Sequence, residues 1–152
     1  MYRASHDGWR ASNFHSKCDH QGPTLTVIRS TGGYIFGGFC DTAWSSDGCW
    51  KASPKAFLYA LRCHSGLVPT KMRLKQKNDS YAVKHKISRG PIFGAGAGIR
   101  VSDNANIGAS SYTCVGGSYE CPAGQTETLF LTGHEYFQAS EVEVFSVQKN
   151  EL

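Results

Sequence analysis

TLTVIRSTGGYIFGGFC, residues 24–40, is the stretch that decides the fold. Two runs rich in β-branched and aromatic residues, 24–30 and 34–40, stand on either side of Thr-Gly-Gly. Glycine can take the positive φ angle that a tight turn needs, so the pattern predicts two antiparallel strands joined by a short turn. Leu25 and Val27, and then Tyr34 and Phe36, occupy alternate positions, as they would in a half-buried pair of strands.

The rest of the chain is predicted to form short strands with few helices. Strands are expected at 55–63, 81–87, 99–102, 128–133 and 141–147, a second Gly-Gly hairpin at 111–121, and loops or turns at 64–80 and 89–98. One short helix is expected over 12–22, with Ser12 as its N-cap. The pattern predicts an α+β, mainly β fold: a two-sheet antiparallel β-sandwich with short peripheral helices, in a single domain over residues 1–152.

Composition and charge restrict the class of protein. Of the 152 residues, 40% are hydrophobic and 18% charged, which is typical of a soluble globular domain. No apolar run approaches the ~18 residues of a membrane span, and residues 1–10 lack the apolar core of a signal peptide. The net charge is +4, and basic residues gather in 71–86. Because no nucleic-acid-binding motif accompanies them, we interpret this segment as solvated surface and expect no nucleic-acid partner.

The glycine-rich stretch GAGAGIRV, residues 94–101, raises the question of a phosphate-binding loop. A dinucleotide loop needs GxGxxG between a strand and the start of a helix. Ile99 and Val101 stand where the third glycine would be required, and the residues that follow are β-branched rather than helical. We therefore expect the glycines to permit positive φ angles or close approach of strands.

The six cysteines leave the redox state open. An even number is compatible with disulfides in an oxidising compartment, and Cys114 and Cys121 could meet across the second predicted hairpin. Cys18 is three residues from His15, a spacing that could activate a thiolate. Phe14 lies on the same predicted helix face, so we favour a buried, inert thiol at Cys18.

Two further clusters invite functional interpretations that we do not favour. Residues 5–7 are Ser, His and Asp, but adjacency in sequence is not the geometry of a catalytic triad, and no GxSxG motif occurs. Asp103, Asn104 and Asn106 offer oxygen ligands, but one carboxylate is few for calcium, so local Asx turns are favoured. We expect no catalytic residue, no metal and no cofactor.

Four motifs in order resemble one family. They are YRASHDGW with FHSKCDHQGPTLTVIRSTGGYIFGGF (2–9 and 14–39), GPIFG (90–94), SDNAN (102–106) and EVEVF (141–145). Over residues 2–147 the chain resembles a TLDc domain, with the spacing of short invertebrate or protist relatives of the oxidation-resistance proteins. The resemblance implies a two-sheet sandwich with helices at its edges and no agreed catalytic mechanism. It also implies a cytoplasmic location and links to oxidative-stress protection and to the vacuolar proton pump.

Aromatic residues in or beside predicted loops are the candidate binding residues. Together with the polar run described above, the candidates for a loop binding surface are Trp44, Trp50, Tyr112, Tyr119, Asp103, Asn104 and Asn106. The alternative is that the aromatic rings cover the ends of the sandwich. We expect a non-enzymatic interaction domain with a protein partner. The alternative is a secreted, disulfide-containing, lectin-like protein that binds carbohydrate, and a thiol-based antioxidant enzyme is a third candidate.

Overall fold

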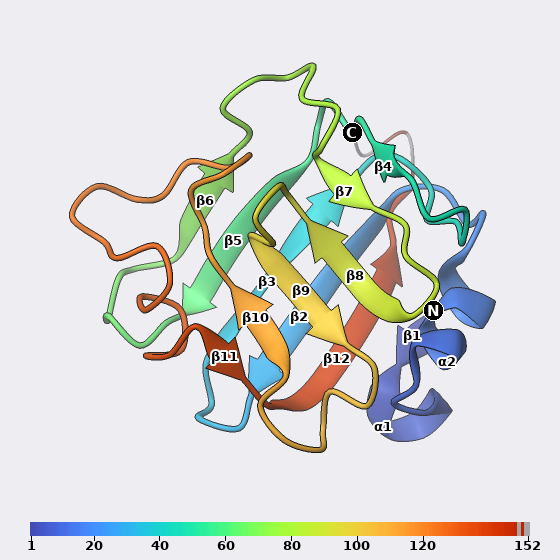
Figure 1. Ribbon diagram of the computed structural model, residues 1–152, viewed down its shortest axis with the longest axis horizontal. Coiled ribbons are helices and arrows are strands. Elements are labelled where there is room, and N and C mark those ends of the chain that lie inside the picture. Colours follow the sequence, from blue (N-terminus) through green and yellow to red (C-terminus); the bar gives the residue numbers. More distant parts are fainter. Residues whose placement is uncertain (149, 151–152) are drawn as a thin grey trace.

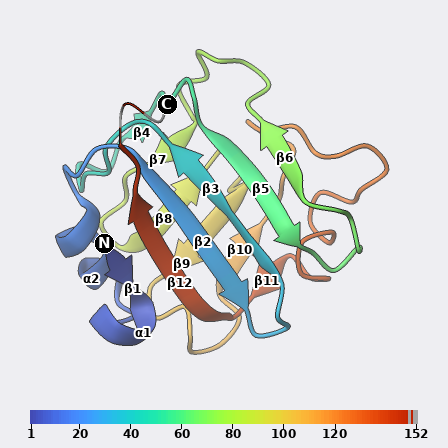
Figure 2. The same cartoon turned by 180° about the vertical axis from the view of Figure 1, so that it is seen from behind.

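Two six-stranded antiparallel sheets lie face to face in the computed structural model, which describes residues 1–148 and 150 (Figure 1). Two short helices, α1 (Ala4–Asp7) and α2 (Ala11–Cys18), lie beside the edge of the first sheet, near the N-terminus (Figure 2). The predicted mainly β sandwich with short peripheral helices is confirmed. Within the described residues, neither helix is long and apolar enough to cross a membrane.

The first sheet has the strand order β1-β12-β2-β3-β5-β6. Its strands are β1 (Tyr2–Arg3), β12 (Ala139–Ser146), β2 (Thr24–Ser30), β3 (Ile35–Cys40), β5 (Phe57–Arg62) and β6 (Thr70–Arg73). The second sheet has the order β11-β10-β9-β8-β7-β4. Its strands are β11 (Tyr136–Phe137), β10 (Ser111–Thr113), β9 (Ile99–Ser102), β8 (Arg89–Phe93), β7 (Val83–Lys84) and β4 (Trp50–Lys51).

The hairpin predicted over 24–40 is confirmed as β2 and β3. The two strands pair from Thr24 opposite Cys40 to Arg29 opposite Ile35, and Gly33 turns the chain with a φ angle of 84°. This hairpin is central to the sheet because β12 pairs with β2 and β5 pairs with β3. The first sheet is therefore assembled on the segment with the clearest strand pattern.

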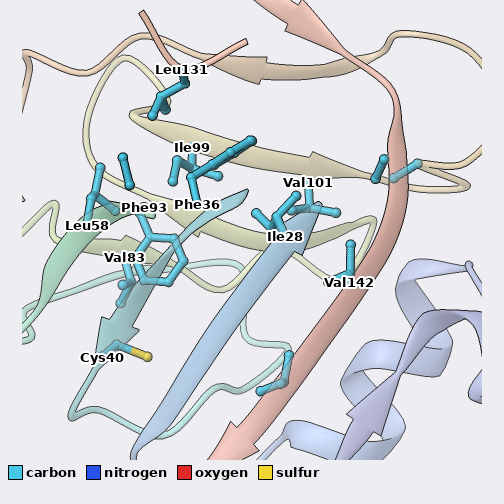
Figure 3. Close-up of a cluster of buried hydrophobic side chains, with 14 of the residues drawn as sticks. Ile28, Phe36, Cys40, Leu58, Val83, Phe93, Ile99, Val101, Leu131 and Val142 are labelled. Atoms are coloured by element: carbon cyan, nitrogen blue, oxygen red, sulfur yellow. The ribbon is translucent and has the colours of Figure 1, made fainter. Parts of the chain in front are cut away.

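Inward-facing side chains of both sheets fill the space between them (Figure 3). The labelled core residues are Ile28, Phe36, Cys40, Leu58, Val83, Phe93, Ile99, Val101, Leu131 and Val142. They come from strands of both sheets and from one loop, and each is at most 5% exposed. Burial of this apolar surface is the main force that holds the two sheets together.

Trp44 closes one end of this core. Its side chain is fully buried, and its indole Nε1 donates a hydrogen bond to Thr24 Oγ1 over 2.9 Å. Its ring contacts Phe14 and Phe93 edge to face, each with 5.6 Å between ring centroids. Trp44 was expected on a loop surface, and the structure corrects this: the ring packs between α2 and both sheets.

Several predicted elements are wrong. The second Gly-Gly hairpin does not form: β10 pairs with β9 and β11 instead of with the residues that follow Gly116 and Gly117. The backbone at Gly117 packs closely against Ala95, where a Cβ would overlap the Ala95 carbonyl oxygen. Segment 128–133 is a series of turns, with Phe130 N–H donating to Thr126 O. Phe130 and Leu131 are buried without belonging to a sheet, so hydrophobicity alone misidentified the segment.

Two strands lie where loops were expected. β8 occupies residues 89–93, in the first half of the predicted turn 89–98. Pro91 is tolerated in this strand because the pairing with β9 is irregular between Arg89 and Ile92. β6 lies within 64–80 as an edge strand, whose exposed polar side chains hide its strand character. Helix α2 begins at Ala11 instead of at a Ser12 cap.

Replacing Gly37 tests the close packing of the hairpin. A Cβ at Gly37 would overlap the Thr26 carbonyl oxygen, which accepts a hydrogen bond from the Tyr59 hydroxyl over 2.7 Å. Gly37→Ala is expected to lower the free energy of unfolding by about 2–3 kcal/mol, measured by urea denaturation. Gly33→Asn is the control, because a Cβ there has nothing within 4 Å and Asn tolerates positive φ. Equal losses in the two variants would contradict this account.

Stability is expected to fall at acidic pH because of His85. Its side chain is 1% exposed, and burial lowers its pKa to about 4. As the pH falls, His85 is protonated in the unfolded chain, near its ordinary pKa of ~6.5, before it is protonated in the folded protein. The contribution of the neutral His85 to the free energy of unfolding is therefore complete above pH ~6.5 and falls by about 3 kcal/mol as the pH is lowered to 4. Unfolding free energies at pH 4 to 7 should show a weaker decline for His85→Gln. The exposed His6→Gln should behave like the wild type; an unchanged decline in His85→Gln would refute the assignment.

Candidate functional site

A row of six residues crosses the outer face of the second sheet, with one residue from each strand. The paired positions, in order, are Trp50, Lys84, Ile92, Arg100, Tyr112 and Tyr136. Directly paired residues of an antiparallel sheet point to the same face. The alternate residues Val83, Phe93 and Ile99 fill the core. The row therefore lies on the side of the sheet that faces away from the core.

A groove of about 330 Å³ follows this row, and we call it the basic groove. It is lined by Trp50, Lys84, Lys86, Arg89, Ile92, Gly96, Ala97, Arg100 and Tyr112. Four of these residues are cationic, and none of the lining residues in the described part of the chain is acidic. Lys84, Arg89 and Arg100 are only partly exposed. The basic groove thus concentrates positive charge in a partly desolvated hollow.

Aromatic rings, rather than carboxylates, support two of the cations. The Lys84 ammonium lies 5.0 Å from the centroid of the Trp50 ring, and the Arg100 guanidinium lies 5.5 Å from that of Tyr112. Tyr81 packs edge to face on Trp50, as Tyr136 does on Tyr112. A ring face attracts a cation without neutralising it, so both charges remain available to an anion.

Arg100 has unused hydrogen-bonding capacity. Its Nε is buried and has no hydrogen-bond partner among the described residues, and one terminal nitrogen reaches the Ser110 carbonyl at 3.5 Å. A guanidinium carries five N–H donors in a planar fork that matches a carboxylate or a phosphate. Arg100 is therefore the residue of the basic groove best prepared to receive an oxyanion.

The glycine-rich loop forms one end of the basic groove. Gly94 and Gly96 have positive φ angles of 87° and 73°, and a Cβ at Gly98 would lie 2.8 Å from the Phe93 carbonyl oxygen. Strand β9 starts at Ile99, directly after the loop. The glycines thus serve a sharp turn and close packing, as the sequence predicted, and the helix that a nucleotide loop requires does not follow.

A buried histidine holds the turn that carries two of the groove cations. His15 Nε2 lies 3.0 Å from the Lys86 carbonyl oxygen and 2.8 Å from that of Arg89. His15 Nδ1 lies 2.8 Å from Asp19 Oδ1, and the Ser46 hydroxyl donates to the other oxygen of Asp19. Both ring nitrogens therefore lie within hydrogen-bonding distance of oxygen atoms. Through His15, helix α2 thereby holds the backbone of the 86–89 turn in place.

The candidate aromatic residues separate into two pairs. Trp50 and Tyr112 line the basic groove. Trp44 is 0% and Tyr119 1% exposed, so the loop surface expected for them is wrong. The Tyr119 hydroxyl donates to the Ala82 carbonyl oxygen over 2.7 Å, and burial raises its pKa. Their rings stabilise the core and lie out of reach of a ligand.

The polar run 102–106 lies outside the basic groove, and its residues form hydrogen bonds with other segments of the chain. Asp103 Oδ1 accepts a hydrogen bond from Ala11 N–H over 2.7 Å, at the start of α2. Asn104 has a positive φ angle of 52°, and the Asn106 carbonyl accepts a hydrogen bond from Gln138. Within residues 1–148 and 150, no three His, Cys, Asp or Glu side chains cluster as metal ligands.

All six cysteines are free thiols in this structure, so the disulfide considered possible between Cys114 and Cys121 does not form in it. The hairpin that would have joined them is missing, which removes the geometric basis for that bond. Burial raises the pKa of Cys18 to about 12, which opposes thiolate formation. Cys18 is fully buried, so the interpretation as a buried thiol is confirmed.

The run of Ser, His and Asp at 5–7 does not assemble into a triad. The Ser5 hydroxyl donates to Glu141 rather than to His6. His6 Nδ1 lies 3.0 Å from Asp7 Oδ1, and the His6 side chain is 84% exposed. The serine therefore lacks the adjacent base that a hydrolytic nucleophile requires.

Sequence reasoning missed most of the basic groove. Lys84 was noticed only as part of the charged segment 71–86, and Arg89 and Arg100 were not singled out. One signal was present: Arg100 stands between the apolar residues Ile99 and Val101 in a predicted strand. An arginine at that position must lie on the outer face, but only the strand register brings it beside Lys84 and Tyr112.

Comparison with known proteins identifies the family. The model of the TLDc domain family matches residues 1–148 of the chain, and no curated protein matches it. The match covers both helices and all the strands of both sheets. Of the motifs that pointed to this family, the first spans β1, α1, part of α2, β2 and most of β3, and EVEVF lies in β12 of the same sheet. GPIFG lies largely in β8 of the second sheet, and SDNAN begins at the last residue of β9. The chain therefore belongs to the TLDc domain family.

Proposed function

We propose that this protein is a non-enzymatic interaction domain that binds a protein partner through the basic groove. The observation that carries the proposal is a set of partly exposed cations, Lys84, Arg89 and Arg100, that have no carboxylate partner among residues 1–148 and 150. The ion pairs found among the described residues involve Arg3, Lys17 and Lys51, and also His6 and His15. Charges that are held in a hollow and left unneutralised favour an anionic ligand.

A second basic surface makes a useful comparison, and we call it the edge patch. It is lined by Pro54, Lys55, Ala56, Phe57, Lys71, Arg73, Leu74 and Lys77. Its four cations are all exposed, and Lys71 alone has a close ring contact, 4.1 Å above Phe57. Exposed cations of this kind are hydrated and screened by salt, so they favour specific binding less than those of the basic groove do.

The contacts of the reactive side chains support a binding role over catalysis. Burial raises the pKa of both Cys18 and Cys40 to about 12. The Ser5 hydroxyl is bound to Glu141. Membership of the TLDc family adds the vacuolar proton pump as the partner to test first, in a role connected with protection against oxidative stress.

Binding to the purified vacuolar proton pump tests the proposal. The double variant Lys84→Glu and Arg100→Glu is expected to bind at least tenfold more weakly than the wild type, measured by biolayer interferometry. The matched control is Lys71→Glu with Lys77→Glu, which changes the net charge by the same amount at the edge patch. It should bind within about twofold of the wild type.

Two outcomes would contradict the proposal in different ways. Wild-type protein that does not bind the pump would remove the pump as the partner. Equal weakening in the two double variants would show that total charge matters and the basic groove does not. Circular dichroism and the melting temperature of each variant establish that the fold is retained.

A further inference from the structure

We propose that the basic groove accepts an acidic, extended segment of the partner, in which carboxylates flank an aliphatic residue. This inference rests on the proposed function and adds the chemistry of the ligand. It follows from three properties of the basic groove: the hydrogen-bonding geometry of its cations, their spacing across the sheet, and the floor between them.

The geometry of the cations favours carboxylates. Arg100 presents a planar guanidinium whose terminal nitrogens make one long contact among the described residues, at 3.5 Å to Ser110 O, and a carboxylate can accept two parallel N–H bonds from such a group. Lys84 is held over Trp50 with its ammonium free of any carboxylate in the described part of the chain. One carboxylate at each position would neutralise charge that the fold leaves uncompensated.

The spacing of the row favours an extended chain over a small anion. Lys84, Ile92 and Arg100 are directly paired on three neighbouring strands. Strands are ~4.8 Å apart, so the outer two residues are separated by roughly 10 Å. Alternate side chains of an extended peptide are ~7 Å apart on one face, so acidic residues four positions apart are ~14 Å apart. The long, flexible side chains of Glu, Lys84 and Arg100 can span the difference of about 4 Å.

The floor between the two cations is apolar. Ile92 lies between Lys84 and Arg100 in the row and lines the basic groove together with Ala97. The middle residue of a segment of the type Glu-x-Leu-x-Glu would lie over this apolar lining, between the two charged contacts, and its own aliphatic surface would leave water. The basic groove crosses the strands on the face of the sheet, so side chains, rather than an added strand at a sheet edge, would carry recognition.

Single-stranded nucleic acid fits the same groove less well. Binding of bases would need free aromatic faces for stacking. Lys84 already lies over the Trp50 ring and Arg100 over the Tyr112 ring, so each ring offers a base less than its full surface. The buried Ile92 floor likewise suits an aliphatic side chain rather than a phosphate backbone.

The test titrates the wild-type protein with the fluorescein-labelled peptide Glu-Ser-Leu-Ser-Glu-Ser-Leu-Ser-Glu and follows fluorescence anisotropy. Its matched control has Gln in place of every Glu. We expect saturable binding of the acidic peptide that weakens as salt is raised, and at least tenfold weaker binding of the Gln peptide. Arg100→Gln should weaken binding of the acidic peptide at least fivefold, whereas Lys71→Gln at the edge patch should leave it within twofold.

The outcomes separate this inference from the proposed function. Absence of peptide binding, together with pump binding that still depends on Lys84 and Arg100, would overturn the acidic segment and leave the interaction domain standing. Equal weakening by Arg100→Gln and Lys71→Gln would overturn the groove as the peptide site. An oligothymidylate that binds more tightly than the acidic peptide, and loses affinity in Arg100→Gln, would overturn the peptide in favour of nucleic acid.

Discussion

The structure depends on the burial of Trp44 between α2 and the two sheets. Its ring contacts Phe14 of the helix and Phe93 of β8, and its indole N–H bonds Thr24 at the start of β2. A large aromatic side chain buries much apolar area, and its single polar atom is satisfied here, so the contact carries little desolvation penalty. The backbone carbonyl of Trp44 also accepts a hydrogen bond from His20 N–H over 2.8 Å, just after α2 ends. One residue thus joins a helix, a strand of each sheet and a long loop.

The same packing reaches the basic groove through α2. Phe14 lies against Trp44, and its neighbour His15 holds the carbonyl groups of Lys86 and Arg89. The turn that carries these two cations is therefore fixed from inside the molecule, while their side chains remain at the groove. Lys84 and Arg100 are supported differently, by aromatic rings on the outer face. In neither case does a carboxylate of the described residues neutralise the cation, which is why the groove keeps its positive charge.

Prediction from the sequence succeeded where a local rule is decisive. Strict alternation in 141–147 corresponds to β12, because a strand with one buried face needs that alternation. The β-rich runs on either side of Thr-Gly-Gly correspond to β2 and β3. Prediction failed where a buried apolar segment is not a strand, and where a strand contains a residue that strands usually exclude. Phe130 and Leu131 are buried from turns rather than from a strand. Pro91 led to the prediction of a turn in place of β8, because proline is rare in strands; here the pairing with β9 is irregular around it.

The sequence by itself determined the fold class and the family, because these depend on local pattern and on the order of motifs. It could not distinguish Trp44 from Trp50, six positions apart in one predicted loop, of which the first is buried and the second lies in β4 and lines the groove. That choice depends on partners such as Phe93 and Tyr81, far along the chain. Only the tertiary structure decided the site, because the cations converge through the register of separate strands, which long-range packing sets.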